Sequence, residues 1–314
     1  MSELKLIGTQ IDIYKEMKKT LSRLKRKIVG QPVVVNLEKY SYNNPARTTE
    51  IQEFQKKHGY SIVPVSYFEP IPDLRELDLN NEDSVIQMKK IDFEYDTNWL
   101  RKSGFDLLAN LKKTLPSYLV ENPMLPLTDM IVYARMIEDS RPKTIIEIGS
   151  GYSACLVDHL KSLLGLDFNL ICIEPFPNTH LEKLASENKC TLIRKRVQDI
   201  SKEESQLIGD MRENDILFID TSHVSHYDSD TNFLFTDVLP LVKSGVNVHI
   251  HDIFLPYEYD KKMYFKAGRF YTEQYLVAAV LSNSDFYKPL FGSYYFWKAN
   301  SLEEYGASFW MKRT

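Results

Sequence analysis

Short apolar runs alternate with amphipathic stretches over the second half of the chain. Each of four runs is followed by a glycine, an acidic residue or a histidine, at residues 144–148, 170–173, 216–219 and 246–250. Apolar positions with helical spacing separate these runs, at residues 152–164, 179–188 and 229–242. Strands separated by helices of this length are typical of βαβ units, which form a parallel sheet covered by helices. The sequence therefore predicts an α/β fold with a doubly wound, mostly parallel sheet.

The end of the chain predicts a different pairing. Apolar and aromatic residues fill positions 286–291 and 294–297, on either side of Gly292-Ser293. Two such runs around a glycine are typical of a β-hairpin. We therefore expect an antiparallel hairpin at the edge of the sheet, and a short tail over residues 301–314.

The first 125 residues have a mixed pattern, which predicts a smaller α+β N-terminal region before the main domain at 126–300. Residues 1–30 place apolar side chains at helical spacing with lysines and arginines between them. This pattern is typical of a basic amphipathic helix that binds an anionic membrane surface or an acidic partner. The alternative is a solvated helix whose apolar stripe packs on the protein or on a second subunit, as in a homo-oligomer. Residues 31–125 read as an accessory or substrate region.

Composition narrows the class of protein. The chain has 314 residues, 43% of them hydrophobic, and a formal net charge of −4. Without a global positive charge, binding to nucleic acid is not expected. The three cysteines form no Cys-x-x-Cys pair, which favours reduced thiols inside a cell. No signal peptide and no run of about 18 apolar residues is present, so we expect a cytoplasmic protein without a transmembrane segment.

A glycine-containing turn follows the first strand of the predicted sheet. Gly149 and Gly151 permit a tight turn and let a ligand approach the backbone. The next strand ends at Glu174, where a carboxylate can accept hydrogen bonds from both hydroxyls of a ribose. A turn of this kind fits a dinucleotide as well. Glu147, two residues before the first glycine, favours a cationic amino group over a pyrophosphate, and hence S-adenosylmethionine over NAD.

Two polar pairs follow the next strands of the sheet. Asp220 and His223 come after one strand, and His251 and Asp252 come after its neighbour. Because ligands bind at the carboxyl ends of parallel strands, we expect these four side chains to converge there. Carboxylate oxygens can hold Mg²⁺ or another divalent cation, which lowers the pKa of an acceptor hydroxyl. A histidine can instead remove the proton without a metal ion.

These residues together resemble the class I S-adenosylmethionine-dependent methyltransferases. The resemblance rests on the string Glu-Ile-Gly-Ser-Gly-Tyr-Ser at 147–153, on Glu174, on Gln198-Asp199 and on Asp220. It implies a seven-stranded sheet and assigns the adenine amino group to Asp199 or its neighbours. The cofactor-binding residues that it implies are Glu147, Gly149, Ser150, Gly151, Tyr152, Ser153, Glu174, Asp199 and Asp220.

The cluster at 220–252 resembles metal-dependent small-molecule O-methyltransferases. By that resemblance Asp220 and Asp252 are metal ligands and His223 is the general base. His251 stands where those enzymes usually have an acid, so it is either a third ligand or the base. The wider strings Phe-Ile-Asp-Thr-Ser-His-Val and His-Ile-His-Asp-Ile-Phe-Leu-Pro are similar to methyltransferases found with bacterial glycan-biosynthesis enzymes.

The sequence as a whole predicts an O-methyltransferase that acts on a hydroxyl of a sugar or glycan-linked molecule. In it His223 and His251 are the candidate catalytic residues. One alternative is an NAD-dependent oxidoreductase or epimerase that uses the same glycine turn. Another is a non-catalytic nucleotide-binding scaffold of a glycan-assembly complex.

Overall fold

The computed structural model describes residues 85–86, 88, 90–101, 107–122, 124–261, 263, 269–300 and 306–314. The predicted basic helix at 1–30 and most of the accessory region at 31–125 lie outside these residues. The chain divides into two compact units, one of residues 1–82 and 259–270 and the other of residues 83–258 and 271–314. The second unit contains the sheet and all of the candidate site residues.

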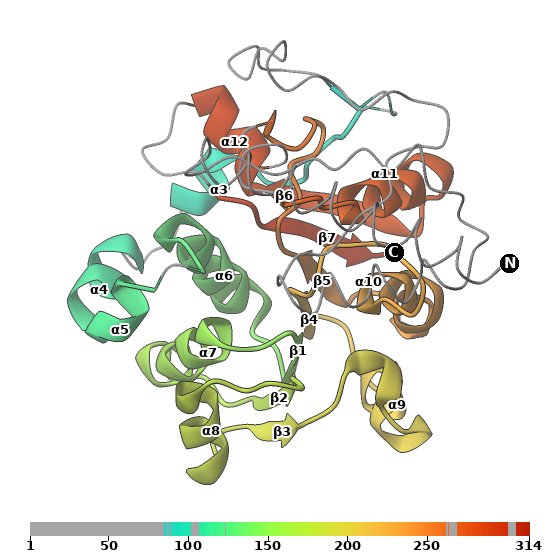
Figure 1. Cartoon of the computed structure of the whole chain (residues 1–314). Helices are drawn as coiled ribbons and strands as arrows, with labels where there is room; N and C mark the ends of the chain where they lie inside the picture. The colour runs from blue at the N-terminus through green and yellow to red at the C-terminus, as the bar shows by residue number, and fades with distance from the viewer. Residues whose placement is uncertain are drawn as a thin grey trace, which may run out of the picture. The chain divides into compact units, whose positions relative to one another are not determined.

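A seven-stranded sheet forms the centre of this unit (Figure 1). Its strands are β1 (Thr144–Ile148), β2 (Asn169–Ile173), β3 (Thr191–Ile193), β4 (Ile216–Ile219), β5 (Asn247–Ile250), β6 (Tyr287–Gly292) and β7 (Phe309–Arg313). Their order is β3-β2-β1-β4-β5-β7-β6. The first five strands are parallel, and β7 is antiparallel to both of its neighbours. The predicted fold class, a mostly parallel sheet with an antiparallel pair at its edge, is confirmed.

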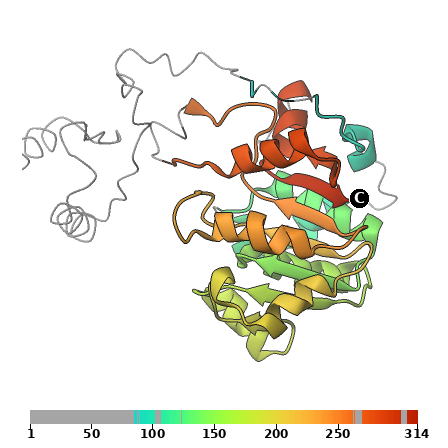
Figure 2. The ribbon, with the colours of Figure 1, turned by 90° about the vertical axis from the view of Figure 1, so that its right-hand side faces the viewer.

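Helices connect the strands and cover both faces of the sheet (Figures 1 and 2). The helices on one face are α4 (Leu107–Thr114), α5 (Ser117–Val120), α6 (Leu127–Ser140), α7 (Tyr152–Leu163) and α8 (Thr179–Ser186). The other face has α9 (Lys202–Gly209), α10 (Asp230–Phe233) and α11 (Glu273–Asn283). The remaining helices are α3 (Thr97–Arg101), α12 (Ser293–Asn300), and the short turns η1 (Val197–Asp199), η2 (Leu234–Val238) and η3 (Leu239–Leu241).

Side chains that alternate along the strands build two cores. Ile145 packs into the core under α6, α7 and α8, whereas Ile146 and Ile148 pack into the core on the opposite face. Ile216 and Phe218 on β4 lie on the first side, and Leu217 and Ile219 lie on the second. Because this alternation has a period of two, the polar Glu147 points to the same side as Ile145.

The predicted hairpin is wrong in its second strand. Residues 294–297 belong to helix α12, and the antiparallel partner of β6 is β7 at Phe309–Arg313, in the stretch predicted as a tail. Tyr294 and Phe296 pack against other aromatic rings, Tyr294 against Phe254 and Phe296 against Phe291. β7 lies between β5 and β6, where Trp310 is fully buried. An inserted strand of this kind leaves no local hairpin signal.

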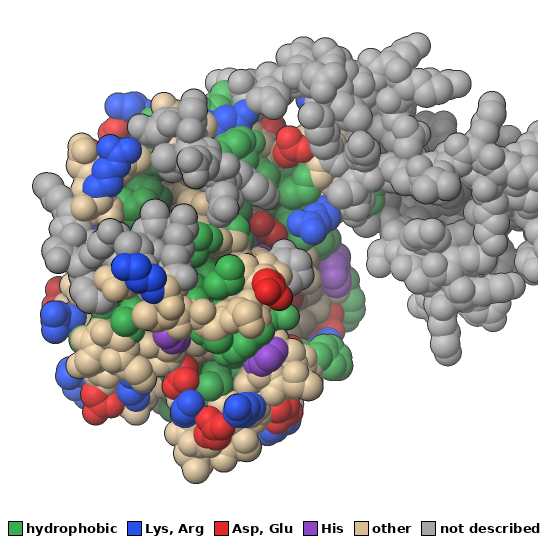
Figure 3. All heavy atoms as spheres, turned by 90° about the vertical axis from the view of Figure 1, so that its left-hand side faces the viewer, with side chains coloured by type: hydrophobic (Ala, Val, Ile, Leu, Met, Phe, Trp, Pro, Cys, Tyr) green, Lys and Arg blue, Asp and Glu red, His purple; other side chains and the backbone are tan. Residues whose placement is uncertain are grey.

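The surface over α4, α5, α7 and α8 carries lysines, arginines and acidic residues interspersed with hydrophobic side chains (Figure 3).

Within the described part of the chain, no helix is both long enough and apolar enough to cross a bilayer.

Candidate active site

The glycine turn joins β1 to α7 and brings three strand ends together. Gly149 has a φ of +79°, and its amide donates to the carbonyl of Ile173 at the end of β2 over 3.0 Å. A Cβ at this position would lie 1.6 Å from the carbonyl oxygen of Asp220, just after β4. Only glycine permits both this backbone conformation and this close approach.

Glu174 lies against the same turn, as predicted. One of its carboxylate oxygens accepts a hydrogen bond from the Ser150 amide (3.2 Å), and the other accepts from the Phe176 amide (2.7 Å). These backbone donors fix the carboxylate at the end of β2, beside the turn that leads to the N-terminus of α7. Each oxygen keeps a lone pair with which to accept a further hydrogen bond from a ligand hydroxyl.

Glu147 is fully buried directly beneath the turn. Its carboxyl group accepts hydrogen bonds from the Ser153 hydroxyl (2.8 Å) and the Tyr133 hydroxyl (3.0 Å). Burial outweighs these hydrogen bonds and raises the pKa of Glu147 to about 8. At neutral pH the ligand-free protein therefore holds Glu147 mainly as the neutral acid, and a cation placed beside it would favour ionisation.

The predicted adenine-side residue Asp199 lies in η1, after β3. Both of its carboxylate oxygens accept from the guanidinium of Arg196, at 2.7 and 2.8 Å. The neighbouring Gln198 donates to the carbonyl of Asp228, and its Oε1 atom is buried without a partner in the described structure. Gln198 therefore offers an unused acceptor where the sequence predicted recognition of the adenine amino group by Asp199 or its neighbours.

The four predicted Asp and His residues do converge. His223 Nε2 lies 3.2 Å from Asp220 Oδ1 and 3.6 Å from Asp252 Oδ2. His251 Nδ1 lies 3.7 Å from Asp220 Oδ1 and 3.6 Å from Asp252 Oδ1. The ends of β4 and β5 thus form a single cluster in which two imidazoles face two carboxylates.

Two further carboxylates complete this cluster, and the sequence reasoning missed both. His251 Nε2 lies 3.2 Å from Asp129 on α6, and His223 Nδ1 lies 2.8 Å from Glu273 on α11. Both carboxylate side chains are fully buried. The available signal was an acid among the apolar residues of a helix, which indicates a paired acid but not its partner.

The backbone of the cluster is held in uncommon conformations. His223 has a φ of +60° and Asp252 a φ of +53°, in the left-handed region that non-glycine residues seldom occupy. The carbonyl of His223 accepts from the amides of Thr272 (2.8 Å) and Glu273 (3.1 Å). Strained residues of this kind concentrate at functional sites, where the surrounding structure holds them in place.

The charges in the cluster stabilise protonated histidines. Burial lowers the pKa of His251, but the carboxylates of Asp220, Asp252 and Asp129 outweigh it and raise the pKa to about 10. The pKa of His223 is also raised, because its carboxylate partners outweigh burial. Burial would raise the pKa of Asp220, yet the two imidazoles hold it at about 2. At neutral pH the cluster therefore contains an ionised Asp220 paired with imidazolium groups.

The predicted metal ligands Asp220, Asp252 and His251 are close together but already paired. In the part of the chain that the structure describes, no three His, Cys, Asp or Glu side chains are placed to hold a metal ion. Asp220 and Asp252 each face a ring nitrogen of both histidines. The raised pKa values of these histidines favour the imidazolium form, which cannot bind a metal ion.

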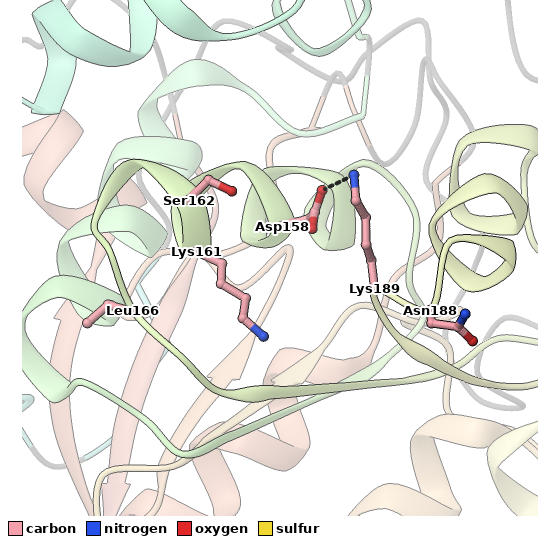
Figure 4. A pocket seen from close by; sticks show the side chains of 6 residues that line it. All are labelled: Asp158, Lys161, Ser162, Leu166, Asn188 and Lys189. Atoms are coloured by element: carbon pink, nitrogen blue, oxygen red, sulfur yellow. Dashed lines mark ion pairs between the residues drawn. The ribbon is translucent and has the colours of Figure 1, made fainter.

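A hollow lies near the C-terminal end of α7, away from the glycine turn (Figure 4). Its lysines are engaged: Lys189 pairs with Asp158 at 3.3 Å, and Lys161 donates to the carbonyl of Phe168 at 2.7 Å. These contacts leave no charged group directed at a ligand, in contrast to the cluster at the ends of β4 and β5.

Comparison with known proteins agrees with this location. Residues 146–253 match the family model described as a methyltransferase domain. The chain carries a methyltransferase domain. The match spans the glycine turn, Glu174 and the four Asp and His residues at the ends of β4 and β5. It confirms the predicted enzyme class, a methyltransferase, over the NAD-dependent alternative. Asp129 and Glu273 lie outside the matched residues.

Individual relatives of the chain are distant. An uncharacterized protein of Archaeoglobus fulgidus is 24% identical over 171 residues, which are 48% of this chain and 74% of that protein. Among solved structures, the O-methyltransferase TomG from Streptomyces achromogenes, in complex with SAM, is 16% identical with a TM-score of 0.41. That likeness covers 70% of this chain and 95% of TomG. The SAH-bound methyltransferase PaMTH1 of Podospora anserina is 16% identical with a TM-score of 0.39. That likeness covers 69% of this chain and 93% of PaMTH1.

Proposed function

We propose that this chain transfers the methyl group of S-adenosylmethionine to a hydroxyl oxygen beside the Asp220–His223 pair. One observation carries the proposal: Gly149, in the turn predicted to bind the cofactor, packs against the carbonyl of Asp220, in the cluster predicted to bind the acceptor. The two functions therefore meet at the ends of β1 and β4, and open α/β sheets bind their ligands at the carboxyl ends of their strands.

The cofactor would lie across the ends of β1, β2 and β4. Glu174, fixed by two backbone amides, accepts the ribose hydroxyls. Glu147 faces the cationic aminoacyl end, whose charge lowers the pKa of this buried acid and so favours the carboxylate. Gln198 and Asp199 lie in the loop expected to receive the adenine. This assignment is supported by the contacts described above and by the match to a methyltransferase domain.

The reaction is an in-line displacement in which the acceptor oxygen bonds to the methyl carbon and S-adenosylhomocysteine leaves. The sulfonium is already activated, so the protein supplies alignment and a group that accepts the hydroxyl proton. His223 is the candidate base, since its Nε2 atom faces Asp220 and Asp252 at the end of β4, where the proposed acceptor hydroxyl would lie. It acts as a base only after it has lost its own proton, and the carboxylates of Asp220, Glu273 and Asp252 disfavour that loss. His251, with a pKa of about 10, stays cationic and stabilises developing negative charge on the acceptor oxygen.

This proposal uses no metal ion. A divalent cation remains the alternative that the sequence resemblance raised, with Asp220, Asp252 and His251 as ligands. A metal ion would have to displace the protons of both histidines, because ligating imidazole is neutral. Addition of a chelator separates the two mechanisms: proton-only chemistry predicts unchanged turnover, whereas metal-assisted chemistry predicts its loss and recovery with Mg²⁺.

The acceptor class is proposed as a hydroxyl of a sugar or a glycan-linked molecule. Its support is the resemblance of the strings around His223 and His251 to methyltransferases found with glycan-biosynthesis enzymes. The experiment is to incubate the full chain with S-adenosylmethionine and a panel of nucleotide sugars, free monosaccharides and catechol, and to measure S-adenosylhomocysteine. Turnover with a sugar that His223→Asn abolishes, with S-adenosylhomocysteine binding retained, supports the proposal. Turnover with catechol alone contradicts the sugar, and no turnover with any acceptor favours the scaffold.

A further inference from the structure

Each histidine of the cluster is held from behind by a buried carboxylate that lies outside the matched methyltransferase residues 146–253. Asp129, on α6, contacts His251 Nε2 at 3.2 Å, and Glu273, on α11, contacts His223 Nδ1 at 2.8 Å. Both contacts leave the second ring nitrogen directed at Asp220 and Asp252. In both contacts, a carboxylate on a helix that flanks the matched domain, α6 or α11, orients one imidazole of the cluster.

The two supports differ in how firmly they are fixed. Asp129 accepts hydrogen bonds from the amides of Ala307 (2.9 Å) and Ser308 (3.0 Å), in addition to its contact with His251. Glu273 Oε2 contacts His223, whereas Glu273 Oε1 is buried without a hydrogen-bond partner in the described structure. A buried carboxylate oxygen without a partner is costly, so the position of Glu273 is not explained by the packing of α11 alone.

The first turn of α11 also holds the main chain of His223. The amides of Thr272 and Glu273 donate to the His223 carbonyl, and the Thr272 hydroxyl accepts from the amide of Ser225 over 2.7 Å. These contacts maintain the left-handed conformation of His223, whose φ is +60°. Glu273 therefore binds both the backbone and the ring of one histidine, and the orientation of that ring depends on α11.

We propose that Glu273 is a positioning residue for His223. Its carboxylate accepts a hydrogen bond from Nδ1–H, which fixes the tautomer whose Nε2 lone pair faces the substrate hydroxyl. The same hydrogen bond prevents the ring from turning. Asp129 fixes His251 in the corresponding way, but with its carboxylate tied to two backbone amides. This inference rests on the proposed methyl transfer. It assigns His223, whose ring contacts a carboxylate with no other hydrogen-bond partner in the described structure, to proton transfer, and it assigns His251 to a fixed cationic role.

Loss of the Glu273 carboxylate should disturb turnover much more than cofactor binding. Without the Glu273 carboxylate at Nδ1, the neutral ring of His223 can hold its proton on Nε2. In that tautomer Nε2 has no lone pair with which to accept the proton of the substrate hydroxyl. General-base assistance contributes roughly 10²–10⁴ in rate, so kcat should fall by about that factor. The cofactor contacts at Glu174 and the glycine turn do not involve α11, so the Kd for S-adenosylhomocysteine should stay within about threefold.

The test compares Glu273→Met with Glu273→Gln. The Met variant keeps the size of the side chain but cannot accept a hydrogen bond from Nδ1–H, whereas the amide oxygen of the Gln variant still can. The matched control is Glu258→Gln, because Glu258 accepts from Tyr275 on α11 but lies outside the cluster. Turnover and the Kd for S-adenosylhomocysteine are measured for each folded variant. The inference predicts a loss of at least 100-fold in kcat for the Met variant, recovery of at least tenfold for Gln, and no change for the control. An unchanged kcat, a parallel loss of cofactor affinity or no recovery with Gln overturns it.

A second readout does not need methyl transfer. In the ligand-free protein, the hydrogen-bonded Nδ1 proton of His223 should give a protected ring resonance in proton NMR, assigned by its loss in His223→Asn. The inference predicts that this resonance survives in Glu258→Gln and disappears in Glu273→Met. If wild-type protein shows no turnover with any acceptor, the proposed function fails, and this resonance alone decides whether Glu273 positions the ring. A resonance that persists in Glu273→Met overturns the inference.

Discussion

Replacing Gly149 by alanine tests how tightly the glycine turn is built into the sheet. The new Cβ would lie 1.6 Å from the carbonyl oxygen of Asp220, and real Cβ atoms essentially never come within 3.0 Å of such an atom. The turn and the end of β4 would therefore have to separate by about 1.4 Å. That movement would stretch the hydrogen bonds from Gly149 to Ile173 (3.0 Å) and from Asp220 to Ile148 (2.9 Å).

The magnitude follows from three contributions. A φ of +79° costs an alanine about 1–2 kcal/mol relative to glycine. Each weakened hydrogen bond contributes about 0.5–1.5 kcal/mol. Overpacking of a closely packed region adds about 1–3 kcal/mol. Together these predict that Gly149→Ala lowers the free energy of unfolding by about 3–8 kcal/mol, and that any folded variant binds S-adenosylhomocysteine poorly.

Gly165→Ala is the matched control. Gly165 also has a positive φ (+60°), but a Cβ added there would have no neighbouring atom within 4 Å. It should therefore lose only the conformational part, about 1–2 kcal/mol. Urea unfolding followed by circular dichroism measures both variants under the same conditions. Equal losses for the two alanines would refute the reasoning, because the close contact with Asp220 would then contribute nothing.

Three further predictions concern the polar residues of the site. Glu174→Gln should raise the Kd for S-adenosylhomocysteine about tenfold in calorimetry, while Glu182→Gln, an exposed glutamate paired with Arg194, should leave it unchanged; equal Kd values would remove Glu174 from the site. Glu147→Gln should stabilise the ligand-free protein at high pH. In the wild type, the pKa of Glu147 is about 8 in the folded state and about 4.5 in the unfolded state, so the free energy of unfolding falls as pH rises between these values. The total loss is about 5 kcal/mol, and the Gln variant avoids it. The same substitution should weaken cofactor binding, and a stability difference that does not vary with pH would contradict it. The kcat should rise as pH increases above 6.5, because the folded pKa of His223 is raised and only the neutral imidazole accepts a proton; a rate that has levelled off by pH 6.5 would exclude this base.

The parallel half of the sheet was predictable because each of its strands carries its own signal. Apolar runs ending at Gly149, Glu174, Asp220 and His251 show where the strands stop, and the fold class then places those residues at one edge of the sheet. The convergence of His223 with His251 could be predicted on these grounds, and the contacts confirm it.

The residues that hold the cluster from outside were not predictable in the same way. Asp129 lies on a helix that precedes β1, and Glu273 begins a helix that is separated from β5 by residues 251–272, so neither stands at the end of a strand. Their contact with the histidines depends on how α6 and α11 pack, which no local pattern encodes. The same limit explains the misplaced strand: β7 enters the sheet between β5 and β6 through long-range pairing, so adjacent apolar runs at 286–291 and 294–297 were misleading.

The protonation of the site was likewise beyond the sequence. The residue types allow either a metal ion or a proton network, and the choice depends on distances. Asp220 lies 3.2 Å from His223 Nε2 and 3.7 Å from His251 Nδ1, and this separation stabilises imidazolium groups.

A crystal structure of the full chain with S-adenosylhomocysteine tests the central claim most directly. The account predicts that the ribose hydroxyls contact Glu174, that the amino group lies beside Glu147, and that the sulfur atom faces the cluster of Asp220 and His223. A nucleoside bound elsewhere on the sheet, or a sulfur atom directed away from that cluster, would contradict it.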